Sequence, residues 1–352
     1  MFRYRCGKKA VPLCLLAILV FLLYRYGITW LSGKGSKPNR INLFPKVRNS
    51  PVLIYQPDDS HTQHGSIIFH KKGCQIRNCL LTTIEGHKYT ADVIVFGENS
   101  AWEPPSPRLS SQFWIIRLLE SPANTNSLTV YDGKVNATIS YRLDSDLPVA
   151  YGQYESFVIP QTSAAKLNFA EGKTRMVCWI VSNCFTNNHR MEYARRLARY
   201  IQVDIFGACG KRSLNKPEAH RMIREHYKFY LAFENSNCHQ YITEKFWINA
   251  LRNDAVPIVM GAPKSDYLRV APPNSFIHVD DYTPEQLSRY LQYLDRNQTA
   301  YNEYFVWKKY GRVADSDYYC RLCAFVQSPP QKIYSSVDRW WQDSEDCEKY
   351  AR

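Results

Sequence analysis

Acidic residues are absent from the first forty positions of the chain, which instead carry eight basic residues: Arg3, Arg5, Lys8, Lys9, Arg25, Lys34, Lys37 and Arg40. Removing these eight from the net charge of +13 leaves +5 for the other 312 of the 352 residues. A nucleic-acid-binding domain carries its excess positive charge on its folded part. The charge distribution therefore argues against nucleic acid as a partner.

The sequence also lacks an internal repeat and a low-complexity tract, which excludes repeat architectures and compositionally biased linkers. Apolar residues make up 45% of the chain and aromatic residues 14%, enough for a packed core. A length of 352 residues suits two ordinary domains or one large one.

An unbroken apolar run covers Ala10–Tyr24 and, after Arg25, resumes over residues 27–31. The first part alone spans only ~22 Å as a helix, whereas the whole segment, with Arg25 reaching to the headgroups, spans ~33 Å. No small-x-small cleavage site follows the run. We therefore expect an uncleaved signal-anchor helix over 10–31. By the positive-inside rule, we expect residues 1–9 to be cytosolic and the chain after Leu31 to be lumenal.

Nine of the eleven cysteines follow this predicted anchor, and in an oxidising lumen they are expected to form disulfides. Because nine is odd, at least one of them stays unpaired. The alternative is a zinc site, for which Cys320-x2-Cys323 has half of the usual spacing. Its only comparable partner, Cys74-x4-Cys79, lies some 240 residues away, which disfavours zinc. Two glycosylation sequons, at Asn136 and Asn297, agree with a lumenal location.

The composition changes along the chain and predicts its organisation. A basic segment with Gly, Ser and Pro over 32–50 indicates a stem, and residues 166–173 indicate a linker. Apolar runs between turn-rich stretches predict strands in a first domain, 51–165. These runs are Val52–Tyr55, Ser66–Phe69, Ala91–Phe96, Phe113–Leu119 and Ala137–Tyr141.

Strands and helices alternate in the second predicted domain, 166–319. The expected strands are Met176–Val181, Val203–Phe206, Phe229–Phe233, Val256–Met260 and Phe276–Val279, and the expected helices are Asn187–Ile201, Thr243–Leu251 and Pro284–Asp295. Such alternation predicts a parallel sheet with helices on both faces, which binds ligands beyond the carboxyl ends of its strands. The segments after Val181, Phe233 and Met260 should therefore meet at one site.

Arg190 falls where the first of these strands passes into a helix. Unpaired amide groups and the helix dipole favour an anion there, and a guanidinium can hold a diphosphate at two points. A solvated surface arginine is the alternative, as expected for its neighbours Arg195 and Arg196.

Glu234 and Asn235 end a predicted buried strand, and Glu244 and Lys245 open the following helix. Lys245 can neutralise charge on a leaving diphosphate, while the two carboxylates can accept hydrogen bonds from sugar hydroxyls. The plainer interpretation of Glu244 is a favourable charge at a helix N-terminus.

Two further groups of carboxylates stand out. Glu120 follows the hydrophobic run Phe113–Leu119, and partial burial would suit it to act as a general base, although a peripheral surface carboxylate is the commoner case. The Asp144-x-Asp146 pair suggests a manganese and diphosphate site. However, Arg142 is close enough to pair with it, and Arg190 with Lys245 reduces the need for a cation. We therefore predict no metal ligands.

At these segments the chain closely resembles the α1,3/4-fucosyltransferases of glycosyltransferase family 10. The resemblance covers roughly residues 93–323 and is carried by Tyr227–Ser236, Tyr241–Trp247 and Val256–Gly261. Leu119-Glu120-Ser121-Pro122 and Tyr141–Asp146 with Tyr151-Gly152 match other signatures of the family.

The resemblance implies a GT-B fold, in which two Rossmann-like α/β domains face each other across a cleft. It implies GDP-fucose as the donor, no obligatory cofactor, and inverting transfer to a glycan hydroxyl; manganese stimulation is compatible with this but not essential. Glu120 then takes the place of the catalytic base and Arg190 that of the diphosphate-binding arginine. Tyr241, Glu244 and Lys245 fall in the donor-binding signature, and Glu234 and Asn235 lie beside it.

The resemblance also implies disulfides that join Cys74 and Cys79 to Cys320 and Cys323, in an order that stays open, so that the extension 320–352 is tethered to the first domain. Cys184 and Cys209 lie just beyond the ends of adjacent predicted strands and form a separate candidate pair.

The chain departs from the vertebrate Lewis-type members of the family at Cys184, where they carry Trp, and at Tyr227, where they carry Cys. Three segments look more like the core-type enzymes of invertebrates and plants: Ser182–Cys184, Phe206–Gly210 and Cys320–Cys323. The resemblance therefore favours a core-type enzyme, which adds fucose to the innermost N-acetylglucosamine of glycoprotein N-glycans in the Golgi as a single-pass type II membrane protein. The alternatives are a Lewis-type enzyme that acts on lactosamine antennae, a catalytically silent lumenal glycan-binding protein, and a metal-dependent transferase that uses the Asp144 pair.

Overall fold

The computed structural model describes residues 49–57, 64–98, 105–161, 168–210, 212–342 and 347. The predicted cytosolic segment 1–9, the anchor 10–31 and nearly all of the stem 32–50 lie outside this part of the chain. Within it, no helix is long and apolar enough to cross a membrane.

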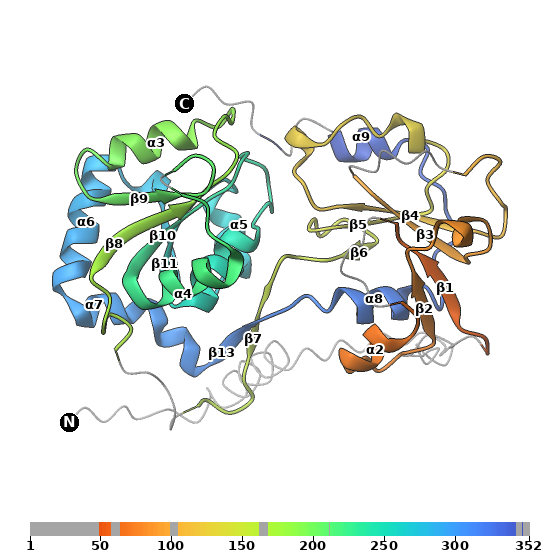
Figure 1. Cartoon of the computed structure of the whole chain (residues 1–352), viewed down its shortest axis with the longest axis horizontal. Coiled ribbons are helices and arrows are strands. Elements are labelled where there is room, and N and C mark those ends of the chain that lie inside the picture. The colour runs from red at the N-terminus through yellow and green to blue at the C-terminus, as the bar shows by residue number, and fades with distance from the viewer. Residues whose placement is uncertain are drawn as a thin grey trace, which may run out of the picture. The chain divides into compact units, whose positions relative to one another are not determined.

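A six-stranded parallel sheet occupies the N-terminal half of the described chain, in the order β2-β1-β3-β4-β5-β6 (Figure 1). Its strands are β1 Val52–Tyr55, β2 Cys79–Thr82, β3 Val93–Gly97, β4 Phe113–Leu118, β5 Ala137–Ser140 and β6 Leu147–Pro148. Along β4, the side chains alternate between the two faces of the sheet. Ile115 packs with α2 (Ile67–Lys71) and α8 (Tyr318–Phe325), whereas Trp114 and Ile116 pack with α9 (Val337–Gln342).

A second parallel sheet of five strands has the order β12-β11-β10-β8-β9. Its strands are β8 Arg175–Ile180, β9 Val203–Phe206, β10 Tyr227–Phe233, β11 Val256–Met260 and β12 Ile277–His278. Both faces are covered, which explains why all seven residues of β10 are buried.

The helices that cover this second sheet divide between its faces. Helices α3 (Arg190–Leu197), α6 (Pro284–Arg296) and α7 (Gln298–Asn302) pack against Phe229, Leu231 and Phe233. The other face, with Tyr230 and Ala232, is covered by α4 (Lys216–His226), the π-helix η4 (Lys245–Ala250) and α5 (Lys264–Val270). The chain is thus α/β with two parallel sheets, as predicted.

Several predicted elements differ from those observed. Ser66–Phe69, predicted as a strand, is the start of helix α2. The linker predicted over 166–173 contributes to the second core, because Phe169 stacks on Phe305 with a centroid distance of 4.3 Å. The helix predicted over Thr243–Leu251 begins at Lys245, and the Thr243 hydroxyl before it donates to the buried Glu234 carboxylate and accepts the Lys245 N–H at 3.5 Å.

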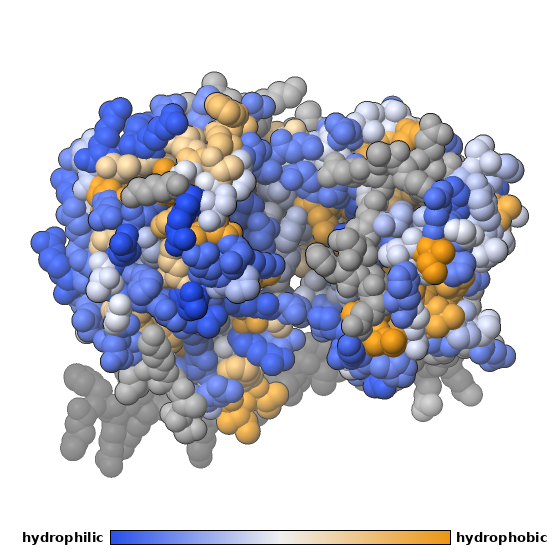
Figure 2. Space-filling view, in the orientation of Figure 1, coloured by the Kyte–Doolittle hydropathy of each residue, from blue (hydrophilic) through white to orange (hydrophobic). Residues whose placement is uncertain are grey.

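The two halves exchange segments. An antiparallel pair joins β7 (Gln153–Ser156), which follows the first sheet, to β13 (Gly311–Ala314), which follows the second. The chain then returns to the first sheet, where α8 and α9 cover opposite faces. Exposed apolar residues on the face drawn in Figure 2 form small groups among hydrophilic ones, because most apolar side chains lie in these cores.

Four disulfides are present among the described residues. Cys74–Cys320 and Cys79–Cys323 fasten α8 to the first sheet, which confirms the predicted tether and settles its order. The candidate pair Cys184–Cys209 is also bonded. The fourth bond, Cys238–Cys347, was not predicted, and the buried Cys178 is the free thiol within the described chain.

Candidate functional site

Glu120 lies just beyond the carboxyl end of β4 and meets residues that follow β10 in the second sheet. Its Oε1 accepts hydrogen bonds from the Tyr241 hydroxyl at 2.7 Å, the Asn235 side-chain amide at 3.1 Å and the Ser121 N–H at 2.9 Å. Oε2 receives no hydrogen bond from the described residues. One carboxylate oxygen is therefore fixed, and the other is not held by the described residues.

A second carboxylate, Glu98, supports the Glu120 loop and was missed in the sequence. It follows β3 and accepts the backbone N–H groups of Leu119 at 2.7 Å and Glu120 at 3.3 Å. Burial raises the pKa of Glu98, although these N–H donors and the Arg117 charge oppose the rise. Beyond the end of β4, the Glu98 carboxylate thus accepts the N–H groups that a neighbouring strand would otherwise accept. These two hydrogen bonds fix the position of Glu120.

Two further contacts hold the loop that follows β4, one from the loop after β10 and one from the segment after β6. The Ser236 hydroxyl donates to the Ser121 hydroxyl at 2.5 Å. The Tyr151 hydroxyl donates to the Leu119 carbonyl at 2.5 Å, and burial together with the Glu244 and Glu234 charges raises its pKa well above the usual value. Tyr151 therefore remains a neutral donor beside the carboxylates.

Glu234 and Lys245 form a buried ion pair at the carboxyl end of β10. The Lys245 Nζ lies 2.9 Å from the Glu234 Oε2 and 3.3 Å from the Glu244 Oε1. Thr243 donates both its N–H, at 2.8 Å, and its hydroxyl to Glu234, which is fully buried. The carboxylate is well satisfied, so the predicted sugar-binding role of Glu234 would compete with these partners.

The pKa values follow from this arrangement. Burial raises the pKa of Glu234, against the attraction of Lys245. Burial lowers the pKa of Lys245, but the Glu234 and Glu244 charges outweigh it and the net pKa is raised. Burial works against ionisation of Glu244 too, yet Lys245 brings its pKa below the usual value. Lys245 is thus cationic at neutral pH.

The helix that carries Lys245 has π geometry over Lys245–Ala250, a form often found at functional sites. It packs closely against Gly152, where a Cβ would lie 2.7 Å from the Trp247 ring. Only a glycine fits this contact. Gly152 follows Tyr151 directly, so the close approach also positions Tyr151.

Arg190, the first residue of α3, is buried rather than solvated, with a relative exposure of 3%. Its amino groups donate to the carbonyls of Phe233 and Asn183, each at 2.8 Å, and its Nε has no partner among the described residues. Burial lowers the pKa of Arg190, with the Glu234 charge opposing. Its contact with a diphosphate stays a prediction.

The segments expected to meet at the second sheet do so. Arg190 connects the segment after β8 to the end of β10, and the Glu234 N–H donates to the Met260 carbonyl of β11 at 2.8 Å. Asn188, another residue missed in the sequence, donates to the Glu234 carbonyl at 2.9 Å and to the Asn237 side chain at 3.0 Å. Asn188 thereby fixes the loop between Glu234 and Asn237.

The Asp144-x-Asp146 pair is engaged in protein contacts. Arg142 donates to both oxygens of Asp144, at 2.9 and 2.6 Å, which confirms the expected pairing. Asp146 accepts from Lys332 at 2.6 Å and from Tyr334 at 2.8 Å. The described residues contain no group of three or more His, Cys, Asp or Glu side chains able to hold a metal ion.

Both sequon asparagines have partners within the fold. The Asn136 side chain donates to the Lys332 carbonyl at 2.9 Å and accepts from Arg108 and the Trp114 N–H. Asn297 caps α7 through the Ala300 N–H. Their glycosylation stays a prediction, and a glycan on Asn136 would replace one N–H of its side-chain amide.

Comparisons with known proteins show the family of the chain. Residues 48–152 match the family "Fucosyltransferase, N-terminal", and residues 170–340 match "Glycosyltransferase family 10 (fucosyltransferase) C-term". The chain is 38% identical to glycoprotein 3-alpha-L-fucosyltransferase A of Drosophila melanogaster over 82% of this chain and 59% of that protein. It is 34% identical to alpha-(1,3)-fucosyltransferase 7 of Bos taurus over 92% of both chains.

A crystal structure of an α1,3-fucosyltransferase with GDP-fucose aligns over 88% of this chain and 97% of that one, with a TM-score of 0.52 and 15% identity. At that identity the likeness shows the fold alone. It supports the expected GT-B-like arrangement of two α/β halves. The chain belongs to glycosyltransferase family 10, the fucosyltransferases.

Proposed function

We propose that the protein is an inverting α1,3-fucosyltransferase that transfers L-fucose from GDP-β-L-fucose to an N-acetylglucosamine hydroxyl of glycoprotein N-glycans. The observation that carries the proposal is the Glu120 carboxylate, which has one oxygen held by Tyr241 and Asn235 and the other open to a ligand. It lies where loops from the two sheets touch, and cationic Lys245 lies on the second sheet's side.

The chemistry follows from these charges. The acceptor hydroxyl attacks the anomeric carbon of fucose and passes its proton to the Glu120 Oε2. The bond from that carbon to the diphosphate oxygen breaks, and GDP leaves with the electron pair. The attack comes from the face opposite the diphosphate, so the β-linked fucose becomes α-linked. Lys245 and Arg190 stabilise the charge that grows on GDP.

Negative charge on the leaving GDP is often offset by a divalent cation. Here two cationic side chains, one of them in a buried ion pair, are already at the carboxyl end of the second sheet. We therefore expect transfer to survive strong chelation, with manganese at most stimulating it.

The core type of acceptor, the innermost N-acetylglucosamine, is favoured by the likeness to the Drosophila protein, whose name specifies a glycoprotein acceptor. The bonded Cys184–Cys209 pair, in place of the Lewis-type Trp, points the same way. A Lewis-type enzyme is the second candidate, because the bovine relative aligns over 92% of both chains.

For location, we propose that the segment 10–31 anchors the protein in the Golgi membrane as a single-pass type II protein, with the described residues in the lumen. The disulfides support an oxidising compartment.

Incubation of the full-length protein with GDP-fucose and a panel of N-glycan and lactosamine acceptors, followed by mass spectrometry, tests the proposal. Fucose on the innermost N-acetylglucosamine is the expected product, and NMR of that product gives its linkage. Fucose on antennae alone would assign the Lewis type. GDP-fucose binding without hydrolysis or transfer to any acceptor would identify a catalytically silent glycan-binding protein.

A further inference from the structure

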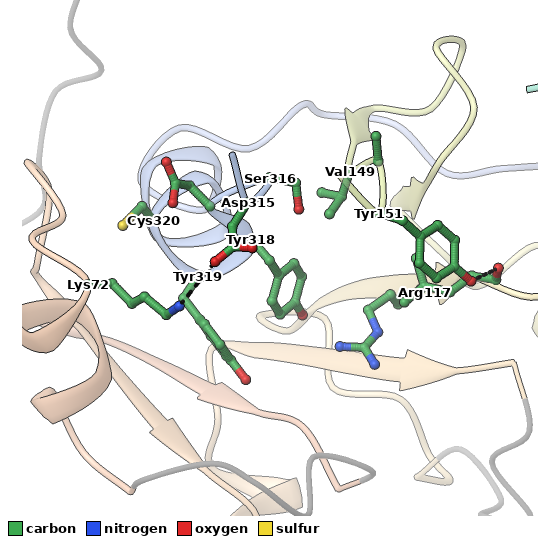
Figure 3. A pocket seen from close by; sticks show the side chains of 12 residues that line it. Lys72, Arg117, Val149, Tyr151, Asp315, Ser316, Tyr318, Tyr319 and Cys320 are labelled. Atoms are coloured by element: carbon green, nitrogen blue, oxygen red, sulfur yellow. Dashed lines mark hydrogen bonds and ion pairs between the residues drawn. The ribbon is translucent and has the colours of Figure 1, made fainter. Parts of the chain in front are cut away.

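A cavity of about 270 Å³ opens next to the Glu120 loop (Figure 3). We call it the Arg117 pocket. The side chains that define it for the argument are those of Lys72, Arg117, Tyr151, Asp315, Asp317 and Tyr318. It lies at the carboxyl end of β4, the edge of a parallel sheet at which ligands bind.

The geometry of β4 explains why the Arg117 side chain lies in this cavity. Along β4, Phe113 and Ile115 belong to the apolar core beneath α8, and Arg117 is the next residue on the same face. At that point the apolar core ends, and the Arg117 guanidinium lies over the Tyr318 ring at 5.2 Å. Arg117 thus presents a charge where the core gives way to the cavity.

The opposite wall is held rigidly in place. Two disulfides fasten α8 to the first sheet, and one of them involves Cys320, which itself lines the pocket. The Tyr318 hydroxyl donates to the Gln56 side chain at 2.8 Å. Asp317, which precedes α8, has a left-handed backbone with φ of 50° and does not cap the helix with its side chain. Such backbone is costly for a residue other than Gly and occurs preferentially at functional sites.

The pocket adjoins the reaction site without including it. Leu119, which lines the pocket, directly precedes Glu120, and Tyr151 donates to the Leu119 carbonyl between the two. Figure 3 shows the Tyr151 side chain among those that line the pocket. A ring in this cavity would therefore neighbour the sugar that Glu120 activates, and would not be that sugar.

The lining suits a neutral polyhydroxylated ring. Lys72 and Arg117 line the pocket together with Asp315 and Asp317, and Asp315 lies 4.0 Å from Lys72 and pairs with Arg252 at 2.7 Å. Cations accept no hydrogen bonds but donate them, and carboxylates only accept them, so the two kinds together match hydroxyl groups, which do both. The Tyr318 ring offers an apolar surface for the apolar face of a sugar. The volume is just below the ~300 Å³ at which pockets for small molecules begin, which fits one sugar rather than a long chain.

We propose that the Arg117 pocket binds a neutral sugar of the acceptor glycan, the one next to the sugar that receives fucose. This proposal rests on the proposed fucosyltransferase function. It gives the Arg117 pocket the role of selecting acceptors longer than one sugar.

Two pocket variants of the full-length protein test it: Ser316→Trp, which fills the cavity, and Tyr318→Ala, which removes its aromatic wall. Tyr200→Ala removes an exposed tyrosine outside the pocket and is the control. KM is measured for an N-glycan acceptor and for a one-sugar N-acetylglucosamine glycoside, with GDP-fucose hydrolysis as the donor-side readout.

We expect both pocket variants to raise KM for the N-glycan by about tenfold, which corresponds to about 1.4 kcal/mol. KM for the one-sugar glycoside, GDP-fucose hydrolysis and all values of the control should stay at the parent level. An unchanged N-glycan KM in folded Ser316→Trp would overturn the proposal, and so would an equal rise for both acceptors.

Failure of the underlying function gives a different result. If the parent transfers fucose to no acceptor, saturation-transfer NMR of the free N-glycan with the parent and the same variants still decides the role of the pocket. Contact with the parent that is lost in Ser316→Trp supports it. Equal contact in parent and variant, or contact with neither, refutes it.

Discussion

Glu120→Gln separates proton transfer from every other task of the site. The Glu120 Oε1 accepts from Tyr241, Asn235 and the Ser121 N–H, and a glutamine carbonyl can keep these partners. The new amide nitrogen would replace Oε2, which has no partner among the described residues. The substitution therefore removes the proposed base and leaves the hydrogen bonds intact. Loss of a general base typically costs ~10²–10⁴-fold in rate, or about 3–5.5 kcal/mol of activation free energy.

The assay compares kcat for transfer, GDP affinity by calorimetry and the unfolding temperature in the variant and the parent. We expect kcat to fall by at least about a hundredfold, with the other two values nearly unchanged. Glu155→Gln is the control, because Glu155 is an exposed carboxylate of β7 that pairs with Arg312 at 3.0 Å. A Glu120→Gln variant that transfers fucose within about threefold of the parent rate would refute the assignment of the base.

The remaining predictions concern charge and cross-links. Lys245→Met should weaken GDP binding and, by leaving Glu234 buried without its cation, lower the free energy of unfolding at pH 7.5 by about 3 kcal/mol. The pKa of Glu234 in the folded protein is already raised and would rise further in the variant, so as the pH falls the folded variant takes up a proton before the unfolded chain does. The loss of thermal stability relative to the parent should therefore be smaller at pH 5.5 than at pH 7.5. An equal loss at both pH values would contradict this. Arg190→Ala should reduce GDP affinity in calorimetry and also destabilise the fold, because two buried carbonyls lose their donor; unchanged GDP affinity would remove Arg190 from the diphosphate site. Replacement of both Cys184 and Cys209 by Ser should lower the free energy of unfolding by about 3.5 kcal/mol, the chain-entropy value for a loop of 25 residues, and denaturant titration under non-reducing conditions measures it.

The sequence predicted the second sheet well because its strands are continuous apolar runs closed by polar or glycine residues. Val203–Phe206 and Val256–Met260 were predicted at their observed bounds. The prediction of a strand over Ser66–Phe69 was wrong, because the pattern of only four residues does not distinguish a strand from the first turn of a helix. Helix α3 starts at Arg190, three residues later than expected, since His189 adopts a left-handed backbone.

The candidate site was predicted only in part. Glu120, Asn235 and Tyr241 were named from sequence, and the structure brings them together. Glu98 was not found, because its role depends on backbone N–H groups of a loop more than twenty residues away, and no spacing rule encodes that contact. The partner of Cys238 was missed for the same reason, since Cys347 stands alone in the sequence.

The return of α8 to the first sheet has a consequence for biosynthesis. A ribosome delivers β1 through β6 long before the helix that covers one of their faces, and the residues that bond across this gap are 246 and 244 positions apart. The second sheet can fold as it emerges, whereas the first keeps an apolar face open until α8 has been synthesised. Chaperones and disulfide isomerases would have to bind the first sheet during translation and prevent its aggregation. A premature stop codon before α8 would leave a nearly complete polypeptide that quality control should retain.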